Sequence, residues 1–362
     1  MLPLLTSDFH SIVLNETPLL DVRAEVEFKK GAFTNATNLA ILNDNERHLV
    51  GTKYKQEGNA AAVKLAEKLI QEEGKNQRVN LWKKYLKENP NALLYCFRGG
   101  QRSAISQDWL HEAGIEITRL KGGYKAFRNY LMEQSLEISE KTDTLILGGR
   151  TGSGKTLLLP EIKNSIDLEK IANHRGSSFG NFISSQPAQI DFENNLAYKL
   201  IQFKSKNYKQ LVIEHESHNI GRSFIPKPIY NNLMNGELIL LETSLEERIE
   251  ITFNEYIVSA LNLYDKKFGE EGITRWANDV DEKLNKIQKR LGHEMYSEFK
   301  LIFHEALKEH INNNNLEDYK EFIKRLLVDY YDPMYDYQIK KSTLPLVFKG
   351  NAKEVLAFIK SY

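Results

Sequence analysis

The feature that most constrains this chain is a glycine-rich loop, Gly149-Arg-Thr-Gly-Ser-Gly-Lys-Thr156, which fits the pattern G-x-x-x-x-G-K-[ST] at every position. The apolar segment Thr144–Leu147 precedes the loop, and a helix is expected to begin near Gly154. Between a strand and a helix, the backbone N–H groups of such a loop surround phosphate oxygens, and the helix dipole adds to the attraction. The sequence therefore predicts a phosphate-binding α/β domain.

The motif also assigns individual roles. Lys155 is expected to contact terminal phosphates, and the hydroxyl of Thr156 is of the type that holds a magnesium ion. The residues expected to bind phosphate are Gly149, Thr151, Gly152, Ser153, Gly154, Lys155 and Thr156. Arg175, beside Gly176-Ser-Ser178, is a further candidate phosphate ligand, with an ordinary loop arginine as the plainer interpretation.

An acidic residue at the end of a neighbouring strand usually completes such a site. The apolar run Gln210–Ile213 predicts that strand, and Glu214 and Glu216 follow it, with a solvated strand end as the alternative. His215 and His218 lie three positions apart. Because no cysteine is near them and no clear third ligand follows, the sequence predicts no metal site built by the protein alone.

The single cysteine, Cys96, excludes an intramolecular disulfide and a four-thiolate zinc site. It follows the apolar run Ala92–Tyr95 and opens the loop Cys-Phe-Arg-Gly-Gly-Gln-Arg-Ser103. The glycine pair allows a tight curve with inward N–H groups, and Arg98, Arg102 and the next helix favour a thiolate. We therefore expect a nucleophile in an anion-binding loop, rather than a small core cysteine.

Alternating strand and helix patterns predict an α/β fold with parallel sheets. In the first part of the chain we expect a strand at Ile12–Leu14, a buried strand at Pro18–Arg23, and helices at Gly58–Ile70 and Ser103–Ala113. In the second part we expect a strand at 236–242 and a helical extension over 245–327, with a break at Asn312–Asn315. The polar segment 133–143 is expected to link two domains, 1–135 and 136–362.

Charge and hydropathy exclude several classes of protein. Lys and Arg number 49, as do Asp and Glu, so the zero net charge does not indicate nucleic acid, and any polyanion must bind a local patch. No stretch approaches the ~18–20 apolar residues of a membrane span. The first residues lack the basic and apolar regions of a signal peptide. We expect a cytoplasmic protein with no membrane partner.

The first part of the chain resembles a rhodanese domain. The residues that carry the resemblance are Asp21-Val-Arg23, Glu27-Phe28, Gly31-Ala-Phe33, Asn38-Leu39, the Cys96 loop and Gly122-Gly-Tyr124. Rhodanese domains carry sulfur, or a heavier congener, on the loop cysteine. Their ordinary loop has four residues between cysteine and arginine, whereas five separate Cys96 from Arg102. Because cysteine phosphatases have the wider loop, we expect this one to admit a phosphate-sized anion.

A rhodanese domain followed by a P-loop domain resembles the bacterial tRNA 2-selenouridine synthase family. Further segments that resemble this family are Glu46-Arg47, Val50–Gly58, Asp167–Glu169, Ala172–Gly180, Gln186-Pro187, Phe192-Glu193, Glu214–Ser217 and Ile220-Gly221. Many members are expected to carry Glu-Asp-Glu-Ser in the acidic segment, where this chain has His215 in place of Asp. Because of this departure, we favour Glu216 over Glu214 as the acidic residue that completes the P-loop site.

The resemblance implies a specific reaction on tRNA. Wobble 2-thiouridine is converted into 2-selenouridine with selenophosphate, through an S-geranylated intermediate made from geranyl diphosphate. We expect the P-loop to hold the diphosphate of the prenyl donor and Cys96 to capture or deliver selenium, with Arg98 and Arg102 orienting the selenophosphate oxyanion. Beyond these co-substrates no cofactor is implied except magnesium.

The helical region from Leu245 onward is the expected tRNA surface. Its helically spaced cations are Lys283, Lys286, Lys289 and Arg290, with a solvated helix face as the plainer interpretation. Trp276, Tyr330 and Tyr331 are aromatic residues that can stack on the anticodon loop or a geranyl chain. Most aromatic residues at helical spacing belong to a core, so we assign none of them to the site.

Three other functions stay open. An ATP-dependent sulfurtransferase or kinase fusion would show nucleotide turnover that depends on Lys155. A cysteine phosphatase would release phosphate through Cys96 and Arg102, although Tyr95 stands where that class usually has histidine. An RNA-binding module with decayed loops fits less well, because both loops retain their chemical residues.

Overall fold

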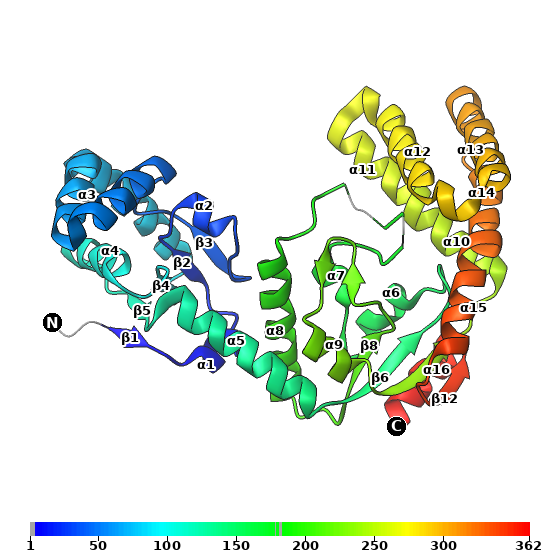
Figure 1. Cartoon of the computed structure of the whole chain (residues 1–362), viewed down its shortest axis with the longest axis horizontal. Helices are drawn as coiled ribbons and strands as arrows, with labels where there is room; N and C mark the ends of the chain where they lie inside the picture. The colour runs from blue at the N-terminus through cyan, green and yellow to red at the C-terminus, as the bar shows by residue number, and fades with distance from the viewer. Residues whose placement is uncertain (1–3, 178, 181–182) are drawn as a thin grey trace. The chain divides into compact units, whose positions relative to one another are not determined.

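The structure is a computed structural model that describes residues 4–177, 179–180 and 183–362, and it divides into two compact units, each with its own sheet (Figure 1). Unit 1 comprises Met1–Lys141 and Pro187–Asn207, and unit 2 comprises Thr142–Gln186 and Tyr208–Tyr362. Both five-stranded sheets are parallel. The predicted α/β class is confirmed.

The sheet of unit 1 has the order β1-β5-β4-β2-β3. Its strands are β1 (Leu5–Thr6), β2 (Leu19–Asp21), β3 (Ala36–Asn38), β4 (Leu93–Tyr95) and β5 (Thr118–Leu120). Its helices are α1 (Phe9–Leu14), α2 (Glu25–Phe28), α3 (Asp44–Glu88), α4 (Gln101–Glu112), α5 (Gly123–Glu140) and α8 (Gln189–Ser205). Because β4 is the middle strand, Cys96 emerges from the centre of the sheet at its carboxyl end.

Two local predictions for unit 1 were wrong. Ile12–Leu14 belongs to helix α1, not to a strand, because Asp8 caps the helix by accepting the Ser11 N–H at 3.1 Å. Most of the predicted linker 133–143 is helical, because α5 continues to Glu140 with Ile138 still buried. The predicted helices at 58–70 and 103–113 are confirmed, although α3 breaks at Gly58 and Gln71.

Helix α8 follows β7 of unit 2 in the chain but packs on α5 and α1 in unit 1. The Asp191 carboxylate accepts the Ala32 N–H at 2.6 Å, and the Asn194 amide donates to the Ala32 carbonyl at 2.6 Å. Arg128 of α5 forms an ion pair with Glu193. The segment lies within 136–362, the range that the sequence predicted for the second domain, yet its polar contacts hold it on unit 1.

A buried ion pair closes the end of β2. Arg23 Nη2 lies 2.6 Å from Asp21 Oδ2 and donates to the Gly31 carbonyl at 2.8 Å. The guanidinium also lies 4.0 Å from the ring centroid of Tyr124. Both charged side chains are almost fully buried. The Asp21-Val-Arg23 segment therefore connects the end of β2 to the loop at Gly31 and to the first turn of helix α5.

Replacing Arg23 by methionine is expected to lower the free energy of unfolding by about 3–5 kcal/mol, because it leaves the Asp21 carboxylate buried without its counter-charge. Urea unfolding followed by circular dichroism measures the loss. The control is Lys29→Met, which removes an exposed ion pair with Glu25 and should leave the unfolding curve nearly unchanged. A loss below about 1 kcal/mol for Arg23→Met would contradict the structural role.

The sheet of unit 2 has the order β12-β11-β6-β8-β7, which places β6 in the middle. Its strands are β6 (Asp143–Gly148), β7 (Ser165–Ile166), β8 (Gln210–Glu214), β11 (Glu237–Leu241) and β12 (Leu346–Gly350). The short strands β9 (Asn219–Ile220) and β10 (Ser223–Phe224) form a separate hairpin. Leu147 of β6 pairs in register with Glu214 of β8, so the P-loop and the acidic segment leave the same edge of the sheet.

Unit 2 also contains short helices around the sheet and a helical extension. The short helices are α6 (Lys155–Leu158), η1 (Leu159–Glu161), α7 (Leu168–Ala172), α9 (Lys227–Leu233) and α16 (Ala352–Ser361). The extension contains α10 (Leu245–Phe253), η2 (Asn254–Val258), α11 (Ser259–Phe268), η3 (Gly269–Glu271), α12 (Gly272–Leu291), α13 (His293–Asn313), α14 (Tyr319–Arg325), η4 (Leu326–Tyr331) and α15 (Asp332–Lys341). The predicted extension and its break after Asn313 are confirmed. Among the described residues, no helix is long and apolar enough to cross a membrane.

Candidate functional site

Cys96 lies at the base of a tight loop between β4 and α4. Its side chain is 3% exposed, and Sγ lies 3.2 Å from Ser103 Oγ. Ser103 in turn donates to the Gly100 carbonyl at 3.0 Å. Arg119 of β5 donates to the Gly99 carbonyl at 3.3 Å. Sequence reasoning gave no role to Ser103 or Arg119, which hold the sulfur and the loop in place.

The glycine pair after β5 closes on the cysteine loop. The Tyr124 N–H donates to the Cys96 carbonyl at 2.9 Å, and the Lys125 N–H donates to the Phe97 carbonyl at 3.0 Å. Gly123 has a φ of 59°, and a Cβ there would lie 2.3 Å from the Cys96 carbonyl oxygen. Only glycine fits at this position. The two segments that carry the family resemblance therefore form one structure around the cysteine.

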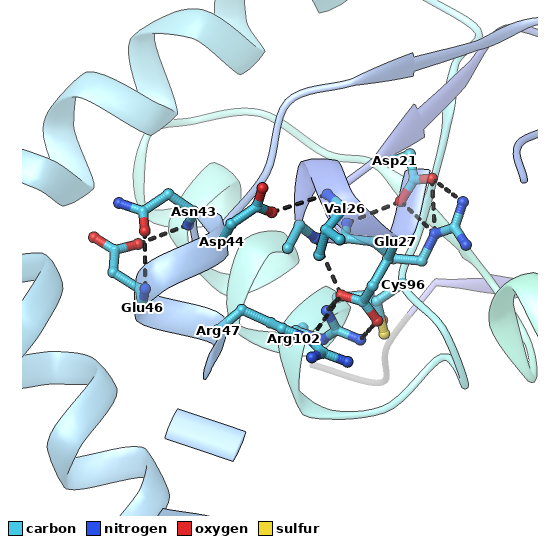
Figure 2. A network of polar contacts seen from close by, with 12 residues as sticks. Asp21, Val26, Glu27, Asn43, Asp44, Glu46, Arg47, Cys96 and Arg102 are labelled. Atoms are coloured by element: carbon cyan, nitrogen blue, oxygen red, sulfur yellow. Dashed lines mark hydrogen bonds and ion pairs between the residues drawn. The ribbon is translucent and has the colours of Figure 1, made fainter. Parts of the chain in front are cut away.

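The two loop arginines have different surroundings. Arg102 forms a two-point ion pair with Glu27, with distances of 2.5 and 3.1 Å, close to Cys96 (Figure 2). Burial raises the pKa of the Glu27 carboxyl, but the Arg102 bonds outweigh it and lower that pKa overall. Arg98 is exposed at the rim of the loop. Arg98 is therefore free of the Glu27 contact, whereas Arg102 is held by it.

The P-loop follows β6 with an extended glycine-rich turn and a very short helix. Gly152 has a φ of 76°, and a Cβ there would lie 2.5 Å from Thr252 Oγ1, so a larger residue does not fit. Helix α6 covers only Lys155–Leu158 before a 3₁₀ turn, because Pro160 cannot continue the hydrogen-bonding pattern. The predicted helix is therefore shorter than expected and its dipole is small. Lys155 Nζ donates to the Gly149 carbonyl at 2.8 Å.

A buried arginine from the helical extension supports the P-loop. Arg248 of α10 donates to the Thr151 carbonyl at 3.0 Å and forms a two-point ion pair with Asp332, with distances of 2.6 and 2.9 Å. It is 2% exposed. The extension therefore fixes the shape of the phosphate loop. Because Arg248 lies about a hundred positions from the motif, no local pattern identifies it.

Three carboxyl groups gather beside Lys155 and Thr156. Glu169 of α7 accepts the Thr156 hydroxyl at 3.2 Å and the Gly176 N–H at 2.5 Å. Glu216 lines a cavity that Lys155 and Thr156 also line. Glu214 is fully buried and accepts the Glu169 N–H at 3.2 Å. Glu169 was not predicted as a site residue, although it lies in a segment that resembles the family.

The donor set beside Thr156 fits magnesium. Mg²⁺ favours oxygen ligands and is usually held by one or two carboxylates together with substrate phosphates. Thr156 Oγ1, the Glu169 carboxylate and Glu216 supply such oxygens, and a buried oxygen of Glu214 has no hydrogen-bond partner. No group of three or more His, Cys, Asp or Glu side chains within the described ranges forms a metal site by itself. An ion here would therefore depend on phosphate oxygens for the rest of its ligands.

Burial and mutual repulsion raise the pKa values of Glu214 and Glu216. Burial, followed by repulsion from Glu169, raises the pKa of Glu214 well above its ordinary value. Burial and the Glu169 charge also raise the pKa of Glu216, from 4.5 to about 7. The pKa of Glu169 is raised by burial as well. Each of these carboxyl groups therefore holds its proton to a higher pH than an ordinary glutamate does.

The Glu216→Gln variant is expected to be more stable than the unchanged protein, by about 1 kcal/mol at pH 5 and about 3 kcal/mol at pH 8. Between pH 4.5 and 7 the folded protein binds more protons at Glu216 than the unfolded chain, so stability falls as the pH rises. Urea unfolding over this pH range measures the difference. Glu161→Gln changes an exposed acid as a control, and a pH-independent difference for Glu216→Gln would contradict the shift.

The P-loop lines a cavity of about 380 Å³. Its other charged or polar lining residues include Glu169, Arg175, Ser177, His215, Glu216, Ser217, Glu255, Arg290 and Gln338. Arg175 also lies 3.7 Å from Glu255 and 4.8 Å from the ring centroid of Tyr256. The structure therefore places Arg175 in the lining of the P-loop cavity with the predicted loop residues, while nearby Ser178 lies outside the described residues.

A second, apolar slot of about 80 Å³ lies next to this cavity, because six residues line both. They are Thr151, Arg175, Ser177, Glu255, Tyr256 and Tyr331. The slot then runs between apolar side chains that include Ile257, Ala260, Leu263, Trp276, Val280 and Leu327. The π-helical segments η2 and η4 both contribute to its wall. Such irregular turns are frequent at functional sites.

The predicted cationic face of α12 is divided in the structure. Lys283 is buried and lies 2.7 Å from Asp279 in an ion pair, so it does not belong to a solvated face. Arg290 lines the P-loop cavity, and Lys286 lines a separate cavity. The aromatic residues Trp276, Tyr330 and Tyr331 belong to the core of the extension. The four cations thus do not form one landing surface.

Comparisons with known proteins match both parts of the chain. Residues 142–362 match the family described as tRNA 2-selenouridine synthase AAA domain, and residues 7–130 match the rhodanese-like domain. A tRNA 2-selenouridine synthase of Sulfurovum sp. is 53% identical and covers 99% of this chain and 98% of its own length. Synthases of Hydrogenovibrio crunogenus and Shewanella denitrificans are 44% and 43% identical, each covering 98% of this chain and 98% and 97% of their own lengths.

Proposed function

Because the chain belongs to the tRNA 2-selenouridine synthase family, we propose that it converts wobble 2-thiouridine of tRNA into 2-selenouridine. The selenium donor is selenophosphate, and the reaction passes through an S-geranylated intermediate made from geranyl diphosphate. Two phosphate-bearing co-substrates need two anion sites. The Cys96 loop and the P-loop supply one each, and only the first contains a nucleophile.

The observation that carries the geranyl step is the apolar slot that shares a wall with the P-loop cavity. An ordinary nucleotide would leave such a slot without a use, whereas a prenyl diphosphate has a charged end for the loop and a hydrocarbon tail for the slot. An apolar cavity of roughly 150 Å³ holds one benzene ring. At about 80 Å³ the slot therefore admits the first carbons of the chain, and flexible side chains such as Leu263 must turn aside for the rest.

In the alkylation step, the thiocarbonyl sulfur attacks C1 of the prenyl donor. A carbon–sulfur bond forms, the carbon–oxygen bond breaks, diphosphate leaves and the uridine loses its N3 proton. The P-loop N–H groups and Lys155 hold the departing charge, and Arg175 is close enough to assist. Thr156, Glu169 and Glu216 would hold a magnesium ion, which neutralises further charge on the diphosphate when bound.

In the selenium step, the Cys96 thiolate attacks phosphorus of selenophosphate while Arg98 and Arg102 hold its oxygens. The phosphorus–selenium bond breaks, and hydroselenide leaves. It attacks C2 of the alkylated uridine and expels geranylthiolate, which takes up a proton. Water then hydrolyses the S-phosphocysteine to phosphate and the free thiol. The five-residue loop supports this route, because it has the width that phosphate-binding cysteine loops need.

Nucleoside mass spectrometry tests the function directly. The protein is incubated with tRNA that contains wobble 2-thiouridine, together with geranyl diphosphate, magnesium and selenophosphate. We expect 2-selenouridine with all components, and S-geranyl-2-thiouridine when selenophosphate is left out. An unchanged tRNA with verified donors would contradict the proposal and favour an ATP-dependent sulfurtransferase.

Replacing Ala260 by phenylalanine is expected to reduce kcat/KM for geranyl diphosphate about tenfold or more, because the ring fills the apolar slot. For the five-carbon donor dimethylallyl diphosphate, kcat/KM should fall much less. Alkylation of tRNA with each donor measures the ratio. Ser259→Phe, which changes the exposed neighbour of Ala260, is the control, and an equal loss for both donors would contradict a chain-binding slot.

A further inference from the structure

The cysteine loop opens into a large cavity within unit 1 that the inorganic selenium donor does not need. The cavity measures about 710 Å³ and includes Cys96, Phe97 and Gly100 in its lining. Small-molecule sites in proteins have volumes of ~300–1,000 Å³. Selenophosphate is a small, strongly charged ion that gains nothing from apolar surface, so another group must account for the shape of this cavity.

Apolar side chains make up a large part of the cavity lining, beside charged and polar ones. Ile41, Leu42, Ala62 and Ile70 lie buried at its floor, and half-buried apolar side chains complete the wall. Those side chains are Val50, Val63, Ala66, Ile105 and Trp109. The charged lining residues include the cations Arg47, Arg98 and Arg102 and the acids Glu27, Glu67, Asp108 and Glu112, and Glu27 forms an ion pair with Arg102. The apolar part of the lining fits a hydrocarbon chain, and Arg98 and Arg102 stand on the loop that begins at Cys96.

Helix α3 builds much of the wall. The helix contributes residues from Arg47 to Ile70, and it breaks at Gly58 and Gln71. The φ of Gly58 is 82°, and a Cβ there would meet no atom within 4 Å. The break at Gly58 therefore bends the wall and does not make room for a packed neighbour. Residues of this segment and of the Cys96 loop line the same cavity.

We infer that this cavity binds the geranyl group of the S-geranylated uridine while C2 of that uridine lies at the Cys96 loop, and that it holds the geranylthiol after displacement. This inference rests on the proposed function, because it assigns a place to the intermediate of that reaction. The carbon–sulfur bond at C2 breaks beside Cys96, so the hydrocarbon tail must lie near the sulfur. Unit 1 thus contains its own prenyl site, separate from the slot beside the P-loop.

The experiment follows selenation alone. Anticodon stem-loops that contain chemically prepared S-geranyl-2-thiouridine or S-methyl-2-thiouridine are mixed with selenophosphate and the full-length protein, without any prenyl diphosphate. The unchanged protein is expected to have a kcat/KM at least tenfold higher for the geranyl substrate. Ala66→Phe, which fills the cavity, should lower that preference at least tenfold and leave the methyl substrate nearly unaffected. Ala60→Phe changes an exposed alanine of the same helix and should behave like the unchanged protein.

Binding of free geranylthiol gives a second measurement if Ala66→Phe folds poorly. Added geranylthiol should inhibit selenation of the geranyl substrate competitively, and Val63→Phe should weaken that inhibition. Equal kcat/KM for the two substrates, together with no competitive inhibition, would overturn the inference even though 2-selenouridine forms. No 2-selenouridine from either substrate would instead contradict the proposed function itself, so the two failures are distinguishable.

Discussion

The Cys96→Ser variant is expected to lose formation of 2-selenouridine by about a thousandfold or more, while S-geranylated tRNA still accumulates. The large loss follows because a serine hydroxyl is a weak nucleophile without an adjacent base, whereas the thiolate attacks directly. The neighbouring hydroxyl of Ser103, 3.2 Å from the sulfur, can donate to a thiolate but cannot act as a base for serine. The P-loop and its apolar slot contain no cysteine, so alkylation should continue.

Two measurements make this prediction specific. Nucleoside mass spectrometry compares the seleno and geranyl products of the two proteins, and intact-protein mass spectrometry after a brief reaction looks for phosphate on Cys96. Ser106→Ala is the control. Ser106 is buried in helix α4, as Ser103 is, but its hydroxyl donates to the Arg102 carbonyl and not to the sulfur. Undiminished 2-selenouridine in Cys96→Ser would remove the cysteine from the mechanism.

The two loops were predictable because each is a local pattern between a strand and a helix. Glycines with positive φ and a lysine at fixed spacing specify the P-loop wherever the rest of the chain lies. Cys96, Gly99 and Gly123 likewise form one structure because β4 and β5 are adjacent in the sheet. The strand prediction at Ile12–Leu14 was wrong, since three apolar residues are too few to separate a strand from a capped helix.

The contacts that tune the sites were not predictable, because they join distant positions. Glu27 lies 75 positions from Arg102 and occupies its guanidinium. Arg248 lies 97 positions from Thr151 and supports the P-loop. Glu27 belongs to a segment that resembles rhodanese domains, but the resemblance does not give its partner. Arg248 stands in no pattern that distinguishes it from other charged residues of a helix. The apolar cavities are even harder to predict from the sequence, because aromatic and aliphatic residues on helices can belong to a core or to a ligand site.

The Lys155→Ala variant is expected to lose S-geranylation of tRNA by about 10²–10³-fold, because one positive donor to the departing diphosphate is removed. In the structure Lys155 Nζ donates to the Gly149 carbonyl at 2.8 Å, so the ammonium group already points along the loop. Lys155→Arg should also be impaired, since the larger planar group does not fit where a compact ammonium binds. Lys163→Ala removes an exposed lysine just beyond the short helix and is the control.

The decisive comparison gives Lys155→Ala a substrate that is already S-geranylated. With selenophosphate it should then form 2-selenouridine at nearly the rate of the unchanged protein, because the diphosphate site is no longer used. Cys96→Ser should fail with the same substrate. This crossed pattern assigns alkylation to the P-loop unit and selenium transfer to the cysteine unit. If Lys155→Ala fails equally with the alkylated substrate, the P-loop takes part in the selenium step as well, and the division of labour between the two anion sites is wrong.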